Sequence, residues 1–206
     1  MSAEHWNARY SETDYIYGTA PNAFLKSSFP ILPKGAVLCL GDGEGRNGVF
    51  LAEQGYTVTS VDYSEVGLRK AQSLAHSRGV SIQTMLCDLS DFTITPRAWS
   101  GIVSIFCHLP PSLRKTVHAQ VVRGLKPQGI FLLEAYSPKQ LQYGTGGPKQ
   151  EELLMPLEEV MHELDGLSFE MAHEIERDVV EGKYHTGKAA VIQIIARKNN
   201  DEHSLA

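Results

Sequence analysis

The first third of the chain carries a cluster of glycines with polar residues between them, directly after a short apolar run. Glycine lets a backbone pass close to a ligand, at positions where any Cβ would collide with it. A helix that starts within such a loop points its unpaired N–H groups at the same place, which suits a carboxylate or a phosphate. The loop residues that we expect to bind a ligand are Gly41, Asp42, Gly43, Gly45, Arg46 and Asn47.

Acidic residues lie at the ends of the next two predicted strands. Asp62 follows Gly41 by 21 residues, and in dinucleotide-binding folds a carboxylate so placed accepts hydrogen bonds from ribose hydroxyls. Asp88 closes the following strand, where it is placed to meet an adenine amino group or, equally, to cap the segment after it. The candidates at these two strand ends are Asp62, Tyr63, Ser64, Asp88 and Leu89.

Two histidines are the candidate catalytic residues. His108 follows Phe106 at the end of the fourth predicted strand, an edge where α/β sheets bind ligands, and would be a base, a substrate contact or a surface residue. His185 lies in the last hairpin turn and either reaches the pocket mouth or is exposed. Tyr17 is expected to cover the ligand from an N-terminal lid, unless it belongs to a helix packed on the sheet. Arg114 would guide an anion at the pocket edge or be an exposed helix residue.

The elements that must position these residues alternate between strand and helix. The expected strands span residues 36–40, 56–61, 80–86, 101–106, 130–135, 168–180 and 187–197. Helices are expected at 47–54, between Ser64 and Gly79, at 110–125 and at 156–164. Repeated strand–helix–strand units require right-handed crossovers and a mostly parallel sheet, here closed by an antiparallel pair. The pattern predicts an α/β fold.

Residues 43–48 also spell G-x-G-x-x-G, the fingerprint of nicotinamide dinucleotide binding. The turn already begins at Gly41, so Gly43 is not the first glycine after the strand. Asp88 closes the third strand with an acid, and the nucleotide fold leaves no room for a separate catalytic domain. We therefore expect the spelling to be coincidental, with a nicotinamide-dependent oxidoreductase as the alternative enzyme.

Residues 36–136, together with the terminal strand pair, resemble a class I S-adenosylmethionine (SAM)-dependent methyltransferase. Residues 17–22 and 45–47 resemble the tellurite-resistance-type branch of small-molecule methyltransferases. The resemblance implies a Rossmann-like, doubly wound sheet of seven strands, with SAM as the cofactor. It places the loop glycines at the methionine part of SAM, Asp62 at the ribose, and Asp88 and Leu89 at the adenine.

The glycine loop departs from that family in one respect. Cys39 stands where the family often has an acid, and Asp42 stands where it often has a cysteine. The exchange leaves one acid in the loop, so its contact with the amino group of the cofactor is not carried over. A non-catalytic SAM-binding sensor is therefore a second alternative.

The resemblance implies methyl transfer to a small molecule. The Asp-Pro-Pro-Tyr type of motif, found in amine and base methylation, does not follow the fourth predicted strand. A soft nucleophile based on sulfur, selenium or tellurium would need no strong base, whereas a hydroxyl or an amine would need one. We expect a small-molecule acceptor, with a soft nucleophile favoured.

Composition excludes several other classes of function. With 42% hydrophobic and 21% charged residues, the chain can fill a globular core. Its formal net charge is −5, whereas proteins that bind the phosphates of nucleic acids usually carry a net positive charge. No apolar run approaches the ~20 residues of a membrane span, and the N-terminus does not resemble a secretory signal. We expect neither nucleic acid nor a membrane as a partner.

The cysteines and the chain ends complete the expectations. Cys39, Cys87 and Cys107 are odd in number and widely spaced, which predicts neither disulfides nor a metal site and fits a reducing cytoplasm. We expect one domain over residues 1–197, and the oligomeric state is left open. Within the chain we expect lids at 1–30 and 137–160 and a disordered tail at 198–206.

Overall fold

The computed structural model describes residues 2–200, and strands alternate with helices along it. The strands are β1 (Ala36–Leu40), β2 (Thr57–Asp62), β3 (Gln83–Leu86), β4 (Trp99–Ile105), β5 (Leu125–Tyr136), β6 (Leu167–Glu181) and β7 (His185–Lys198). The α-helices are α1 (Ala3–Tyr10), α2 (Ala23–Ser28), α3 (Arg46–Glu53), α4 (Glu65–Ser77), α5 (Pro111–Gly124) and α6 (Leu157–Glu163). Short 3₁₀ helices lie at Phe29–Ile31, Pro138–Gln142 and Glu151–Leu153. The expected disordered tail falls mostly outside the described residues.

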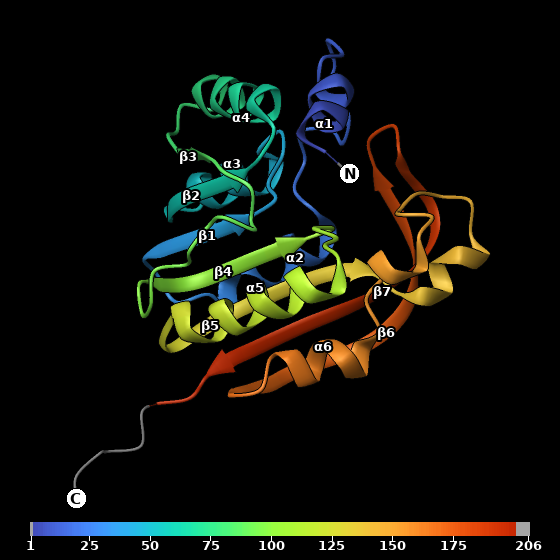
Figure 1. Ribbon diagram of the computed structural model, residues 1–206. Coiled ribbons are helices and arrows are strands. Elements are labelled where there is room, and N and C mark those ends of the chain that lie inside the picture. Colours follow the sequence, from blue (N-terminus) through green and yellow to red (C-terminus); the bar gives the residue numbers. More distant parts are fainter. Residues whose placement is uncertain (1, 201–206) are drawn as a thin grey trace, which may run out of the picture.

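The seven strands form one sheet in the order β3-β2-β1-β4-β5-β7-β6 (Figure 1). Neighbouring strands from β3 to β5 run parallel, whereas β7 pairs antiparallel with both β5 and β6. The mostly parallel sheet with a terminal antiparallel pair is confirmed. The strand order reverses between β1 and β4, and ligands of such sheets bind at the carboxyl ends of the strands beside this point.

Apolar side chains fill a core on each face of the sheet, which makes the fold doubly wound. One core packs β1, β4 and β5 against α5 and α6, with Val121 and Val160 buried within it. The other packs the same strands against α2 and α3, through Leu25 and Leu51. Because strands covered on both faces must be apolar throughout, these cores account for the continuous apolar runs in the sequence.

Two strands begin three or more residues from their predicted start. Residues 126–129, which precede the expected strand 130–135, belong to β5, which begins at Leu125 and has a register shift where β4 passes from Trp99 to Gly101. Strand β3 begins only at Gln83, and it is a largely exposed edge strand.

Within the described residues, no helix is both long enough and apolar enough to cross a membrane.

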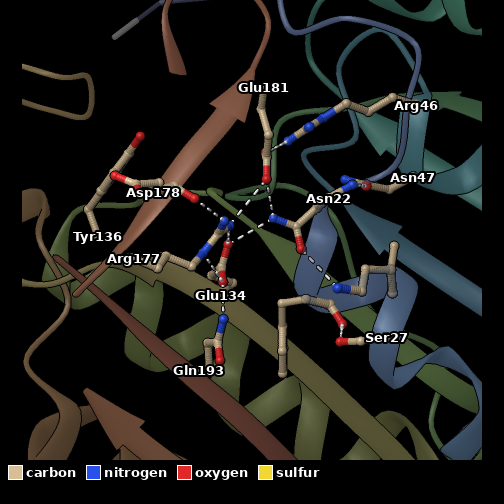
Figure 2. A network of polar contacts seen from close by, with 12 residues as sticks. Asn22, Ser27, Arg46, Asn47, Glu134, Tyr136, Arg177, Asp178, Glu181 and Gln193 are labelled. Atoms are coloured by element: carbon tan, nitrogen blue, oxygen red, sulfur yellow. Dashed lines mark hydrogen bonds and ion pairs between the residues drawn. The ribbon is translucent and has the colours of Figure 1, made fainter. Parts of the chain in front are cut away.

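A buried network of charged and amide side chains joins the two ends of the chain to the sheet (Figure 2). At its centre lies Glu134 of β5, whose side chain is fully buried. Its carboxylate accepts hydrogen bonds from Arg177 of β6, from Gln193 of β7 and, at 2.8 Å, from Asn22 Nδ2. Side chains from segments distant in sequence thereby donate hydrogen bonds to the buried charge of Glu134, which water cannot reach.

A second carboxylate extends the network toward the glycine loop. Glu181, at the end of β6, accepts hydrogen bonds from Asn22 Nδ2 at 2.8 Å and from Arg177 Nη2 at 3.2 Å. It also pairs with Arg46 Nη2 of α3 at 2.6 Å (Figure 2). Two acids and two arginines thus balance each other in the network, and they fasten the β6–β7 hairpin to the start of α3.

We predict that Glu134→Gln destabilises the fold by about 3 kcal/mol, because its amide N–H groups would face the donors of Arg177 and Asn22. Urea unfolding of the variant and the native chain measures the loss. The control is Glu176→Gln on β6, which removes an exposed ion pair with Lys188 of β7 and should change stability little. Equal losses in the two variants would contradict the central place given to Glu134.

Candidate functional site

A cavity of about 810 Å³ opens at the carboxyl ends of the parallel strands. Its walls come from the loop after β1, the ends of β2 to β5, the start of β7, helix α1, and the segment 144–150. In Figure 1, α1 and the turn between β6 and β7 lie next to each other near this edge of the sheet. Twelve of the candidate residues line the cavity: Tyr17, Gly41, Asp42, Arg46, Asn47, Asp62, Tyr63, Asp88, Leu89, Phe106, His108 and His185.

Three candidate residues lie outside the cavity wall and have roles within the protein. A Cβ on Gly43 would lie 2.5 Å from Tyr10 Oη, and one on Gly45 would lie 2.4 Å from Ala71 Cβ. Gly45, with φ of 82°, therefore lets α3 start directly against α4. Ser64 is fully buried and caps α4 by accepting a backbone N–H with its hydroxyl.

Gly41 lines the cavity, but the packing of a neighbouring side chain also requires a glycine at this position. Its φ is 60°, and a Cβ there would lie 2.8 Å from Cys107 Sγ at the end of β4. The loop after β1 and the end of β4 therefore approach each other closely. Close packing within the protein thus accounts for part of what the sequence attributed to a ligand.

Asp62 ends β2 with its carboxylate at the cavity wall. One oxygen accepts the N–H of Gly43 at 2.9 Å, and the other accepts the N–H of Ser64 at 2.8 Å. Burial raises the pKa of this carboxyl group, against the opposing effect of these hydrogen bonds. Each carboxylate oxygen can accept a second hydrogen bond, so Asp62 can still receive hydroxyl groups from a ligand.

Asp42 fastens the glycine loop to its neighbours. Its carboxylate accepts the hydroxyl of Ser60 at 2.6 Å and the N–H of Gly48 in the first turn of α3 at 3.2 Å. The latter contact caps the helix N-terminus with an acid, as the helix dipole favours. Burial raises the pKa of Asp42 to about 7.

Asp88, after the end of β3, caps the next turn and lies at the cavity wall. Its exposed side chain lines the cavity and also accepts the N–H of Ser90 at 2.8 Å, as a cap of the following turn. Leu89 is buried and forms part of the core beneath α5. The segment 87–90 therefore borders the cavity with one acidic and one apolar side chain.

His108 is half-buried, and both its ring nitrogens have partners. Nδ1 lies 2.8 Å from the carbonyl oxygen of Leu153, and Nε2 accepts the N–H of Tyr136 at 3.3 Å. These contacts fit a neutral ring with its proton on Nδ1. Desolvation lowers the pKa of His108 to about 4. The ring ties the segment after β5 to the sheet.

His185 is the first residue of β7, and its side chain is buried among aromatic rings. Its ring centre lies 4.4 Å from that of Tyr17 and 4.7 Å from that of Phe106. Burial holds the pKa of His185 well below its usual range, and nearby Arg46 lowers it further. The expectation of an exposed turn histidine is therefore wrong.

Arg114 matches neither expectation. It is buried, and its guanidinium contacts both oxygens of Glu163 at 2.9 to 3.1 Å and Glu159 at 3.0 Å, while Nη1 donates to the carbonyl of Leu154 at 3.3 Å. These contacts join α5 to α6 and to the segment before it. Among the described residues, histidine, cysteine and acidic side chains do not gather in a metal-binding group.

Sequence reasoning missed Glu44, which lies between two of the loop glycines. It is buried, accepts the N–H of Ile16 at 2.8 Å, and pairs with Lys70 of α4 at 2.5 Å. Glu44 thereby holds the segment that carries Tyr17 over the cavity. It also missed Glu134, although a lone acid in an otherwise apolar strand was a signal that could have found it.

Comparison with known families finds a match for the central part of the chain. Residues 37–129 match a family described as a methyltransferase domain. A 2-heptyl-1-hydroxyquinolin-4(1H)-one methyltransferase of Mycobacteroides abscessus is 26% identical over 117 residues, which are 55% of this chain and 52% of that protein. The chain spans about half the length of the curated relatives that it matches.

Solved structures share the whole architecture. One, from a study of the conversion of a disulfide bond into a thioacetal group during echinomycin biosynthesis, has a TM-score of 0.79 and 17% identity and covers 98% of this chain and 94% of its own. TehB from Haemophilus influenzae has a TM-score of 0.73 and 21% identity and covers 96% of this chain and 67% of its own. At these identities the likeness establishes the fold.

We predict that Asp42 makes stability depend on pH. Because its pKa is raised to about 7 in the folded chain, folding is favoured when Asp42 is protonated, and this stabilisation is lost as pH rises toward 7. Between pH 5 and pH 8 the loss amounts to about 2 to 3 kcal/mol.

Urea unfolding of the native chain and of Asp42→Asn at both pH values measures this effect. The neutral amide keeps an acceptor for the N–H of Gly48 but does not titrate. The stability difference between the two chains should therefore shift in favour of the variant at pH 8. A difference that stays constant with pH would show that Asp42 titrates in its ordinary range.

Proposed function

We propose that this chain is a class I methyltransferase that transfers the methyl group of SAM to a small-molecule acceptor, because residues 37–129 match a methyltransferase domain and the sheet has the strand order given above. The observation that carries the proposal is the cavity at the reversal of strand order, with Asp62 on its wall. Its volume of about 810 Å³ lies within the range of small-molecule and cofactor sites.

The cavity wall fits the parts of SAM. The loop at Gly41 and the start of α3 offer backbone N–H groups to the methionine carboxylate, with Arg46 and Asn47 beside them. Asp62 retains acceptor capacity for the ribose hydroxyls, and Asp88 lies at the next strand end for the adenine. When bound, the cofactor would supply a methyl group attached to a positively charged sulfur. A lone pair of the acceptor would form the new bond to this methyl group, and the sulfur would keep the electron pair of the bond that breaks.

The two histidines are poor candidates for a general base. His108 uses both ring nitrogens in holding the segment after β5. The strongly lowered pKa of His185 makes it a weak proton acceptor. We therefore propose an acceptor that arrives ionised or carries a reactive lone pair, such as a thiolate or another soft nucleophile, or an acidic hydroxyl. The protein positions this group and excludes water from it.

Two similar proteins support this choice of acceptor. The relative from Mycobacteroides abscessus is named for a hydroxyquinolinone acceptor, and the structure from the echinomycin study concerns sulfur chemistry. The hydroxyquinolinone of the first name is a small molecule. The rival nicotinamide-dependent enzyme would bind NAD or NADP in place of SAM.

We predict that Asp62→Ala weakens binding of S-adenosylhomocysteine at least tenfold, or by about 1.4 kcal/mol, because the ribose hydroxyls lose their acceptor. Isothermal titration calorimetry measures the affinity, and NAD serves as the competing ligand. The control is Asp91→Ala, a nearby exposed acid outside the cavity wall, which should bind as the native chain does. Undiminished binding by Asp62→Ala would remove the ribose assignment, and binding of NAD alone would favour the oxidoreductase.

We also predict that the pH dependence of the rate follows the acceptor and not the protein. With a series of aromatic thiols of graded acidity, the midpoint of the kcat/KM profile should move with the pKa of each thiol. Measuring S-adenosylhomocysteine release against pH tests this. A midpoint that stays fixed across the series would assign deprotonation to a group of the protein.

A further inference from the structure

Four aromatic rings form a chamber at the hairpin end of the cavity: those of Tyr17, Phe106, Tyr136 and His185. The ring centres of Phe106 and Tyr136 lie 4.6 Å apart, and His185 lies 4.7 Å from Phe106 and 5.5 Å from Tyr136. Phe106 has a backbone φ of 53°, which residues other than glycine rarely adopt. Such strain is characteristic of ligand sites, where the surrounding structure holds it in place.

Two polar atoms of this chamber lack a hydrogen-bond partner within residues 2–200. They are Tyr136 Oη and His185 Nδ1, on side chains with exposed fractions of 0% and 9%. A buried polar atom without a partner costs about 1 to 3 kcal/mol. Because both residues line the cavity, a ligand seated there can satisfy both atoms. It would accept the O–H of Tyr136, and His185 Nδ1 would donate to it when this nitrogen carries the ring proton, or contact it through water.

The segment after β5 closes this chamber through glycines. A Cβ on Gly146 would lie 3.0 Å from Tyr136 Oη and 3.4 Å from His185 Cδ2. A Cβ on Gly147 would lie 2.7 Å from the Tyr136 ring. The segment therefore packs directly against the Tyr136 ring, beside the two unpaired atoms.

Charges of both signs line the cavity wall, with the acids gathered at one end. Acids line the end formed by the loop after β1 and by β2 and β3: Asp42, Glu44, Asp62 and Asp88, together with Arg46, which pairs with Glu181. Bases line the end formed by α1, the segment after β5 and the hairpin turn: Arg9, Lys149 and Lys183. The contact of the Arg9 guanidinium with the Tyr184 ring, at 4.9 Å, places α1 beside the hairpin. The aromatic chamber thus lies at the end of the cavity whose charged lining residues are bases, of which Lys183 pairs with Glu12.

We infer that the methyl acceptor is a flat aromatic anion, seated in the chamber against Phe106, Tyr136 and His185, with the Tyr136 hydroxyl donating to its charged atom. The inference rests on the proposed function and specifies its substrate class. Stacking on the rings gives the orientation, and the basic end of the cavity selects the ionised form. Tyr136 is then a positioning and specificity residue that leaves the binding of the cofactor unchanged.

The test uses the full chain loaded with S-adenosylhomocysteine and three probes at pH 8, titrated by calorimetry. 4-Nitrophenolate is flat and anionic, 4-nitroanisole is flat and neutral, and cyclohexanecarboxylate is anionic without an aromatic ring. We expect 4-nitrophenolate to bind at least tenfold more tightly than either of the others. Tyr136→Phe, which removes one oxygen, should remove most of this preference while the affinity for S-adenosylhomocysteine stays within twofold.

The matched control is Tyr143→Phe, the same chemical change at a residue outside the cavity wall, which should keep the native preference. Equal affinities for the three probes, or an unchanged preference in Tyr136→Phe, would overturn this inference alone, provided that S-adenosylhomocysteine binds. Failure of S-adenosylhomocysteine to bind would overturn the proposed function and this inference with it. A loss of cofactor affinity in Tyr136→Phe equal to that for the probe would assign Tyr136 to general structure instead.

Discussion

The buried carboxylate of Glu134 constrains the structure more than any other single group. A charge in an inner strand of a sheet is tolerated only where several donors replace the water that it has lost. Asn22, Arg177 and Gln193 supply those donors from the N-terminal segment and from the last two strands. The need to hydrogen-bond this charge therefore brings the segment around Asn22 and the strands β6 and β7 onto the same region of β5.

The network around Glu134 also fixes the wall of the cavity. Tyr136 lies two residues further along β5, and the backbone carbonyl of Glu134 accepts the N–H of Phe106 at 2.7 Å. Glu181, four residues before His185, ties the hairpin to Arg46 at the start of α3. The aromatic chamber and the glycine loop are therefore held in register by the same set of ion pairs (Figure 2).

Desolvation decides the chemistry that is open to the ionisable groups at the site. Desolvation lowers the pKa of both His108 and His185, so both rings stay neutral. Burial raises the pKa of Asp42 and Asp62 instead, because it penalises the charged form of an acid. Histidines with such low pKa values are better suited to packing beside a ligand than to removing a proton from it.

The sequence by itself determined the alternation of strands and helices, the mostly parallel sheet, and the loop and acid at the ends of β1 and β2. These features depend on local periods, on glycine spacing and on crossover handedness, which short segments encode. Tertiary structure alone decided that Gly45 serves helix packing, that His108 has no free nitrogen, and that Arg114 is buried. It also decided that Glu134 joins the two ends of the chain. Burial and partners are properties of residues brought together from distant segments, and no single segment carries that information.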